Sequence, residues 1–391
     1  MSKALRDVVV LDTAASFWAA LGAAFLADFG ATVIRIEELP PASDNNADAS
    51  LDELANRNKR SIALDGRSPA GRRAFEQLVA TADAFVTDAP QAQLAERRLD
   101  YASLAALKPD LVYARGSGFG ADGPDRDLPA LDELAAARTG MMPILPQPGQ
   151  PPVYTGAGQI YTSVMLAFGV TLALLHRDAT GEGQEVDASL FAGNMYGASL
   201  DVQAFLAMGG ERFLRPVSRL DAGNPMSGTL YPTQDGRWVT LTMPDTDRWW
   251  PGLAEITGLD ANDPRFDSHE KRCEDHRLLL MQLFEEAFQR KPAAYWRDRF
   301  DERGLSADVI EDYSYPATDE QARRNRFVLD IERPGRAPAK SLGFPLFLSD
   351  SPARLSRAAP FAGQHTAEVL SDLLGYSEDE IAELEAAGVV R

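Results

Sequence analysis

The sequence predicts an α/β protein, with a doubly wound parallel sheet in a large domain and a smaller α/β domain inserted in the sequence. Apolar runs of strand length alternate with helical segments in the first third of the 391 residues. Hydrophobic residues make up 45% of the chain, enough for a sizeable core. After about residue 200 the pattern changes to turn-rich sequence followed by a second group of helices. These observations predict two domains of different size.

A strand, a helix and a second strand form the repeating unit of the first third. The run 8–12 has strand length, 19–30 has the small-residue composition of a helix closed by Gly30, and 32–37 is a strand again. The pattern continues with strands at 60–65, 83–88 and 110–116, and with helices at 68–82 and 102–107. Successive βαβ units place their strands in parallel, which predicts the large domain.

Residues 221–391 predict a small domain, followed by a C-terminal segment that returns to the large domain. Residues 221–236 are interpreted as a turn-rich crossing, and 237–243 alternate like a strand with two faces. Helices are expected near 248–257, 276–289 and 293–303, with two acidic amphipathic helices in 365–390. The expected divisions are a large domain at 1–205, a linker at 206–224, a small α/β domain at 225–330, and a return linker with C-terminal helices packing on the large domain at 331–391.

Charge and composition narrow the classes of partner. The chain carries 58 acidic and 39 basic side chains, a net charge of -19, which disfavours nucleic acid and anionic membranes. Its one cysteine, Cys273, cannot form an internal disulfide, and no signal-like segment precedes Val8. Apolar runs such as 164–175 are shorter than the roughly 20 residues of a membrane span, so we expect buried helices. We expect a cytoplasmic protein that acts on a small molecule.

The loops that follow the predicted strands do not favour a dinucleotide cofactor. The first strand-to-helix turn, 12–18, lacks the glycines that allow a pyrophosphate to approach a helix N-terminus. The glycine-rich stretch 116–123 follows a later strand and lacks the usual spacing. We interpret it as a structural turn and expect no resident cofactor.

One group of side chains has the spacing of metal ligands. His269, Cys273 and His276 recur at helical intervals and could hold a metal ion. Lys271 and Arg272 lie among them, however, and no fourth ligand is evident. A solvated helix face is the favoured interpretation, and no metal is expected.

Two adjacent acids follow the glycine-rich stretch. Asp132 and Glu133 could act as a general acid or base, although acids in such a place more often cap a helix, and the residues alone favour the cap. His176 and His365 have no serine or cysteine in a nucleophile motif nearby. The sequence therefore predicts no catalytic triad.

Several motifs spread over nearly the whole chain occur in a family-specific order. They are NRNKRSIALD (56–65), SPAGR (68–72), SGFGADGPDRD (117–127), TGEGQEVDASL (180–190), DPRF (263–266) and GQHTAEVLSDLLGYSEDEIAELEAAGVV (363–390). Together they resemble the family III CoA-transferases, a group that includes formyl-CoA transferase, carnitine CoA-transferases and α-methylacyl-CoA racemase. The resemblance implies a Rossmann-like large domain, a small domain and two chains interlocked as a dimer.

The resemblance also implies that the usual nucleophile is missing. Family transferases use an aspartate, ten residues before a glycine in the helix that matches 164–175, to accept the acyl group as an anhydride. Counting back from Gly169 gives Gln159, whose amide cannot form that anhydride. Residues 134–177 contain no aspartate or glutamate, so this result does not depend on the alignment. Asp132 matches the second acid of the family.

A racemase mechanism lacks its base as well. Leu131 stands where racemases of this family carry a histidine. Four aromatic residues, Phe17, Trp18, Tyr154 and Tyr161, could form the apolar walls of a pocket, and such residues are more often plain core. The sequence alone leaves both interpretations of these aromatic residues open.

The resemblance assigns a set of positions to the CoA nucleotide. They are Phe17, Trp18, Arg35, Glu38, Leu64, Asp88 and Arg97. Phe17 replaces a glutamine of formyl-CoA transferase, Glu38 and Glu96 replace arginines, Asp88 replaces an asparagine and Pro129 replaces a lysine. An anion in place of a cation repels phosphate by an amount of order 1 kcal/mol. Arg35 and Arg97 could compensate in part, but the set predicts weak CoA binding.

Three interpretations of function follow. The chain is the nucleophile-lacking subunit of a hetero-oligomeric CoA-transferase, whose paralogous partner supplies the aspartate. Alternatively, it is an enzyme for elimination, isomerisation or hydration that uses Asp132 or Glu133 as its acid-base group, with Gln159 orienting the substrate. The third interpretation is a structural or regulatory protein without catalysis. An acyl-CoA or carboxylic acid is the expected small molecule, and a homodimer or a heterodimer with a paralogue is the expected assembly.

Overall fold

The structure is a computed structural model that describes residues 3–39, 49–333, 335 and 337–391. The chain divides into two compact units, each described here by itself. The first unit comprises Met1–Met142, Val153–Gly210 and Gln321–Arg391, and the second comprises Pro143–Pro152 and Glu211–Glu320.

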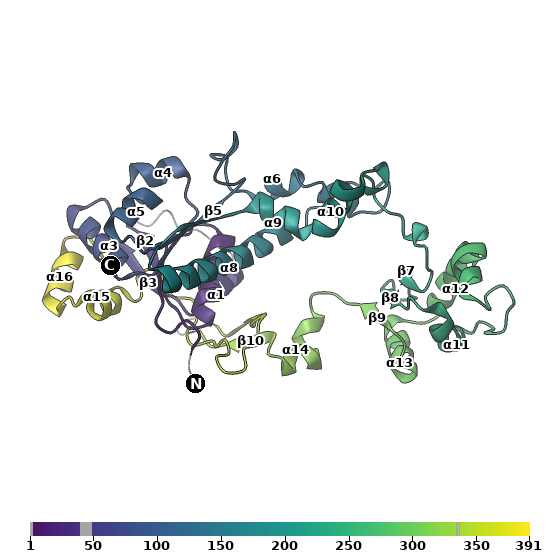
Figure 1. Ribbon diagram of the computed structural model, residues 1–391. Coiled ribbons are helices and arrows are strands. Elements are labelled where there is room, and N and C mark those ends of the chain that lie inside the picture. The colour runs from purple at the N-terminus through teal and green to yellow at the C-terminus, as the bar shows by residue number, and fades with distance from the viewer. Residues whose placement is uncertain (1–2, 40–48, 334, 336) are drawn as a thin grey trace. The chain divides into compact units, whose positions relative to one another are not determined.

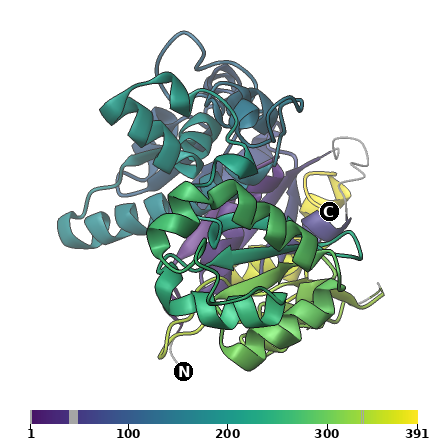
Figure 2. The same cartoon turned by 90° about the vertical axis from the view of Figure 1, so that its right-hand side faces the viewer.

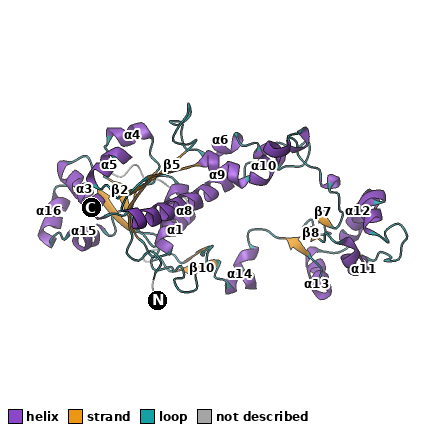
Figure 3. Ribbon diagram, in the orientation of Figure 1, coloured by secondary structure: helices purple, strands orange, loops and turns teal. Residues whose placement is uncertain are grey.

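A six-stranded sheet forms the centre of the first unit (Figures 1 and 3). Its strands are β1 (Val9–Asp12), β2 (Thr32–Glu38), β3 (Arg60–Leu64), β4 (Ala84–Thr87), β5 (Val112–Ser117) and β6 (Glu185–Ser189). They lie in the order β3-β2-β1-β4-β5-β6, and each described neighbouring pair is parallel. This order is that of the doubly wound dinucleotide-binding fold, so the predicted fold class is confirmed.

Helices cover both faces of this sheet. The helices of the first unit are α1 (Phe17–Asp28), α2 (Ala49–Asn56), α3 (Pro69–Thr81), α4 (Gln91–Glu96), α5 (Tyr101–Leu107), α6 (Asp132–Ala137), α7 (Met141–Ile144), α8 (Ala157–Thr180), α9 (Leu190–Gly197), α10 (Ser199–Met208), α14 (Glu320–Arg324), α15 (Thr366–Leu374) and α16 (Glu378–Ala386). Successive residues of β1 point to opposite faces of the sheet and belong to two separate hydrophobic cores. Val10 packs with α1 and α8 on one face, and Leu11 packs with α3 and α15 on the other. Both faces of the sheet are therefore buried from solvent, as is usual for a parallel sheet.

The NRNKR motif stabilises the first unit through buried ion pairs. Arg57 donates to Asp28 at 2.8 Å and to the carbonyl oxygen of Gly343 at 3.1 Å. Lys59 donates to Asp12 at 2.6 Å, and burial lowers the pKa of this fully buried ammonium group. Each charge has a hydrogen-bonded partner, which offsets part of the cost of burying it. The motif therefore has a structural explanation in this chain.

The C-terminal helices pack beside the edge strand β3 (Figure 1), and Figure 2 shows their yellow ribbon near the marked C-terminus from a second side. Val390 forms an antiparallel bridge with Leu64. The backbone N–H of Ser61 donates to Nδ1 of His365 at 3.2 Å. A short hairpin of β10 (Val328–Ile331) and β11 (Ala339–Leu342) precedes this segment.

The second unit contains an antiparallel sheet of β7 (Ser227–Pro232), β8 (Trp238–Thr242) and β9 (Ala307–Ile310). Its helices are α11 (Thr246–Thr257), α12 (Arg277–Phe288) and α13 (Ala293–Arg303). The interpretation of 221–236 as a turn-rich crossing missed a strand, because β7 lies within it. Thr229 and Tyr231 point into the core with a period of two, a pattern that the flanking turn residues concealed.

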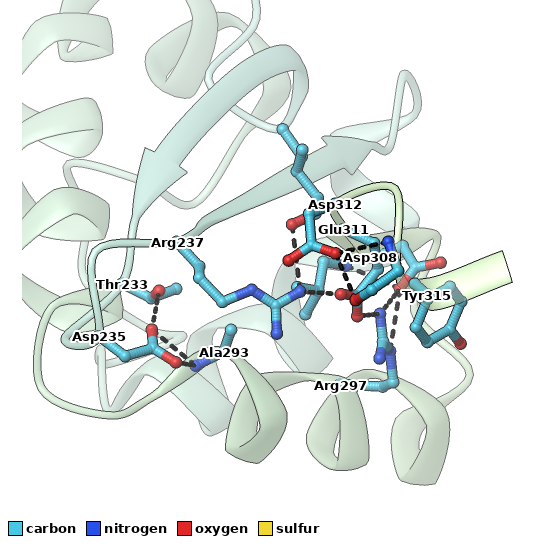
Figure 4. A network of polar contacts seen from close by, with 12 residues as sticks. Thr233, Asp235, Arg237, Ala293, Arg297, Asp308, Glu311, Asp312 and Tyr315 are labelled. Carbon is cyan, nitrogen blue, oxygen red and sulfur yellow. Dashed lines mark hydrogen bonds and ion pairs between the residues drawn. The ribbon is translucent and has the colours of Figure 1, made fainter. Parts of the chain in front are cut away.

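A polar network joins three elements of the second unit (Figure 4). Glu311, just after β9, forms ion pairs with Arg237 beside β8 and, at 2.6 Å, with Arg297 of α13. The guanidinium of Arg297 lies 4.9 Å from the ring centroid of Tyr315. Both carboxylate oxygens of Asp235 accept from the first backbone N–H of α13 at 3.2 Å. The network fixes where the chain leaves this small sheet.

Helix α8 is the longest helix near the predicted site. With 24 residues it is long and apolar enough to cross a membrane by length and composition alone. It packs against α1, α9 and strands β5 and β6. Its place in the fold is therefore that of a helix covering the sheet.

Candidate active site

Gln159 lies in the first turn of α8. The N-cap, Gly156, has φ 69° and ψ 6°, a left-handed conformation that glycine adopts without steric cost, and no acidic residue occurs in the first turn. Gln159 is half-buried, and no described residue forms a hydrogen bond with its side-chain amide. The free backbone N–H groups and the dipole of this helix favour a negative charge here. The position suits a carboxylate or an oxyanion.

Asp132 accepts hydrogen bonds on both carboxylate oxygens. The hydroxyl of Tyr154 donates to Oδ2 at 2.7 Å, and Nδ2 of Asn194 donates to Oδ1 at 2.7 Å. The interpretation of Asp132 and Glu133 as helix caps was wrong. The N-cap of α6 is Leu131, and no side chain caps this helix. Asp132 is only 9% exposed and faces its two donors, whereas Glu133 is exposed.

The side-chain amide of Asn194 is fixed in one orientation by the two acceptors that its Nδ2 contacts. Its Nδ2 donates to Asp132 and also to the carbonyl oxygen of Leu190 at 2.9 Å, so Nδ2 and Oδ1 cannot be exchanged. Its Oδ1 is buried and has no partner in the described chain. A Cβ on Gly158 would lie 2.0 Å from Nδ2. Glycine is therefore required at 158 for Asn194 to reach Asp132.

Tyr154 is the accessible member of this group. The residue is 39% exposed, whereas Asn194 is 1% exposed. Burial of the hydroxyl and its bond to the Asp132 carboxylate raise the pKa of Tyr154 above the ordinary range. The phenol therefore stays protonated at neutral pH and is a hydrogen-bond donor.

Gln159 and Tyr154 flank the same backbone position. A Cβ placed on Gly156 would lie 3.5 Å from Nε2 of Gln159 and 3.8 Å from the hydroxyl oxygen of Tyr154. The fold thus brings together Gln159, Asp132 and Tyr154. The Tyr154 contact was not predicted, because 22 residues separate the two partners and no motif links them.

The cations assigned to the nucleotide are already paired within the chain. Arg35 donates to Asn56 at 2.6 Å and lies 3.6 Å from Glu37. Arg97 forms an ion pair with Glu38. Neither guanidinium group is an unpaired phosphate ligand in this structure.

Asp88 occupies the start of α1. Its two carboxylate oxygens accept from the backbone N–H groups of Ala15 at 2.8 Å and Ser16 at 2.7 Å. These amides follow β1 and Asp88 follows β4, at the point where the strand order of the sheet reverses. That point is the usual ligand crevice of a doubly wound sheet. In this chain the carboxylate of Asp88 occupies that crevice.

The remaining nucleotide positions lie mostly in the core. Trp18 is buried beside Gly116, Phe17 is half-buried, and Leu64 is buried where it pairs with Val390. Tyr161 is partly exposed and packs on Gly197. Of the four aromatic residues, Trp18 is therefore part of the core, whereas Tyr154 and Tyr161 are exposed.

The histidine and cysteine cluster lies in the second unit. Nδ1 of His269 is 2.9 Å from Oγ1 of Thr246 and 3.9 Å from Sγ of Cys273. Burial raises the pKa of the Cys273 thiol. Within the described ranges, no three histidine, cysteine or acidic side chains converge as a metal site.

Known proteins with similar sequences are CoA-transferases. The sequence profile of CoA-transferase family III matches residues 5–366. The cinnamoyl-CoA:phenyllactate CoA-transferase of Clostridium sporogenes is 28% identical over 97% of this chain and 95% of its own length. The succinyl-CoA–D-citramalate CoA-transferase of Chloroflexus aurantiacus is 29% identical over 99% of this chain and 98% of its own length.

A solved structure has the same fold. The crystal structure of a CAIB/BAIF family protein from Brucella suis superimposes with a TM-score of 0.82 at 25% identity, covering 95% of this chain and 100% of the other. The profile match, the full-length relatives and the shared fold agree. The chain belongs to CoA-transferase family III.

Proposed function

We propose that this chain is the nucleophile-lacking subunit of a hetero-oligomeric CoA-transferase. The observation that carries the proposal is the absence of any aspartate or glutamate from residues 134–177, a range that includes α8 up to its last three residues. Anhydride formation needs a carboxylate that can reach the thioester carbonyl. A paralogous subunit with aspartate at the position of Gln159 would supply it.

Asp132 does not replace the missing group as a nucleophile. Each of its oxygens already accepts a short hydrogen bond, and the carboxylate is buried. Hydrogen bonds and burial hold such a carboxylate in place and reduce its reach towards a substrate. Covalent transfer by this chain alone therefore lacks an attacking atom.

An exposed apolar stripe on α8 supports pairing with a second chain. Val164, Phe168, Leu172 and Leu175 recur every three or four residues on one helix face, and Phe168 is 62% exposed. Large contiguous apolar surfaces on soluble proteins commonly mark interfaces. We propose that a second family chain, a paralogue or another copy, covers this stripe in a cytoplasmic complex.

The substrate class follows from the family. The relatives named above act between CoA thioesters and carboxylic acids. We propose an acyl-CoA and a carboxylic acid as the substrates of the complex. The ion pair of Arg97 with Glu38 and the place of Asp88 favour a complex in which the partner chain binds the nucleotide.

A second candidate function rests on the hydrogen bond from Tyr154 to Asp132. A carboxylate held beside a phenol is a suitable acid-base group for elimination, isomerisation or hydration. In such an enzyme Gln159 would orient the substrate. This candidate needs no partner to supply a nucleophile.

Co-purification separates the two candidates. The chain, tagged and expressed in its own host, would be isolated under native conditions and its bound proteins identified by mass spectrometry. A stoichiometric family III chain with aspartate at the matching position is the expected result. Isolation as a homo-oligomer, without such a chain, would contradict the subunit proposal.

A further inference from the structure

We propose that Tyr154 is a catalytic residue, and that Tyr154 and Asp132 together activate water to hydrolyse acyl thioesters bound at the start of α8. This inference rests on the thioester substrate class of the proposed function. It requires neither a partner chain nor acyl transfer. Asn194 acts as a positioning residue for Asp132.

The accessible end of the pair is the phenol. Asp132 is nearly buried and is held on both sides, whereas Tyr154 is 39% exposed and lies 2.7 Å from Oδ2. The oxygen of a phenol that donates one hydrogen bond can still accept another. A water molecule could therefore donate to Tyr154 while Tyr154 donates to Asp132.

Hydrogen-bond donors for the thioester carbonyl oxygen lie next to this pair. The side-chain amide of Gln159 has no described partner, and the first N–H groups of α8 point to the same end of the helix. Such donors stabilise the negative charge that develops on a carbonyl oxygen under attack. Nε2 of Gln159 and the hydroxyl oxygen of Tyr154 both lie within 4 Å of the point where a Cβ on Gly156 would be, so an acyl carbon held by Gln159 could be reached from the phenol.

The chemical step balances without another reactant. The water oxygen bonds to the acyl carbon, and the water proton passes to the hydroxyl oxygen of Tyr154 as the original phenol proton passes to Oδ2 of Asp132. The carbon–sulfur bond then breaks, and the thiolate takes the proton back from the pair. The products are one carboxylic acid and one thiol.

The absent nucleophile explains why water is the acceptor. Without a carboxylate at the start of α8, no acyl-enzyme precedes the attack, and water is the most concentrated nucleophile available. A general base of this kind contributes about 100-fold or more to such a step. Loss of that factor is the expected effect of removing either member of the pair.

The test uses thioesters that lack the nucleotide. The full-length chain is incubated with millimolar acetyl and hexanoyl thioesters of N-acetylcysteamine, and the released thiol is measured. We expect hydrolysis well above the buffer rate, a loss of about 100-fold in kcat for Tyr154→Phe and Asp132→Asn, and no loss for Tyr196→Phe. Tyr196 is an exposed tyrosine of α9 and serves as the matched control.

Two further measurements make the outcome decisive. In a single turnover in ¹⁸O-labelled water, direct attack places the label in the released acid and none in the protein, whereas an Asp132 anhydride that water opens at the aspartyl carbon would place the label in Asp132. Circular dichroism checks that each variant is folded. If Tyr154→Phe does not fold, the rate of Asp132→Asn is the deciding measurement. No hydrolysis by the wild type, equal rates for the folded variants, or label in Asp132 would each overturn the inference. Transfer to an added carboxylic acid by the chain alone would instead contradict the proposed subunit function.

Discussion

Single residues determine which chemistry this member of the family can perform. Gln159 provides hydrogen-bond donors but no nucleophile, while Asp132 is held by Tyr154 and Asn194. Around the expected nucleotide positions, Glu38 and Asp88 place anions where a phosphate would need cations or free amides. These residues therefore predict weak nucleotide binding by this chain.

Reversing two acids should strengthen CoA binding. Glu38→Arg with Glu96→Arg removes two anions and releases Arg97 from its ion pair. With about 1 kcal/mol for each site, we expect an affinity at least tenfold higher by calorimetry at low salt. Glu383→Arg, on the exposed face of α16, controls for net charge. Micromolar binding by the wild type, with no gain in the double variant, would show that the phosphate site lies elsewhere.

His365 should make stability depend on pH. Burial lowers its pKa, and its environment also includes Glu368, Arg357 and Arg60. The unfolded chain therefore takes up the proton first as the pH falls, so the contribution is complete above the ordinary value of about 6.5 and is lost below it. Urea unfolding at pH 7.5 and 5.5 should show a smaller pH effect in His365→Gln than in the wild type or in His176→Gln. Equal pH effects in all three proteins would contradict this assignment.

At the scale of elements, most strands and helices follow from periodicity, but contacts between distant elements do not. The βαβ repeats predict the parallel sheet because strands of four to seven residues alternate with helices. β7 was missed because turn residues surround it. The contact from Asn194 to Asp132 spans 62 residues, and it depends on Gly158 at the crossing of two helices. No local sequence pattern predicts a contact of this kind between distant residues.

The start of α1 should depend on Asp88. Its carboxylate bonds two backbone N–H groups, and Ser16, the N-cap, forms no side-chain cap of its own. Asp88→Ala should lower the free energy of unfolding by about 1 kcal/mol, measured by urea denaturation. Asp122→Ala, in an exposed loop, is the matched control and should have little effect. Equal stability of the two variants would contradict the capping role.

At the scale of the whole molecule, α8 presents an apolar stripe that the described part of the first unit leaves exposed. The chain has a net charge of -19, yet this helix face carries Val164, Phe168, Leu172 and Leu175. An apolar surface of this kind on a highly charged protein is costly unless another chain covers it. The division of labour proposed above also requires two chains.

Charges on this stripe should separate the chains. Phe168→Glu with Leu172→Glu places two carboxylates in the proposed interface, and each should cost at least about 2 kcal/mol of association. We expect light scattering to report monomers of the double variant at micromolar concentration and dimers of the wild type. Leu107→Glu, an exposed apolar residue of α5, is the control. A dimer that persists in the double variant would place the interface on another face.

The most direct test of the central claim is a transfer assay with the purified chain alone. An acyl-CoA donor is mixed with an isotope-labelled carboxylic acid, and labelled acyl-CoA is measured by mass spectrometry, with hydroxylamine added in parallel to trap an acyl-enzyme. Because residues 134–177 contain no carboxylate, we expect no labelled thioester and no trapped adduct at Gln159, even if the donor is slowly hydrolysed. Rapid formation of labelled acyl-CoA by this chain alone would contradict the account.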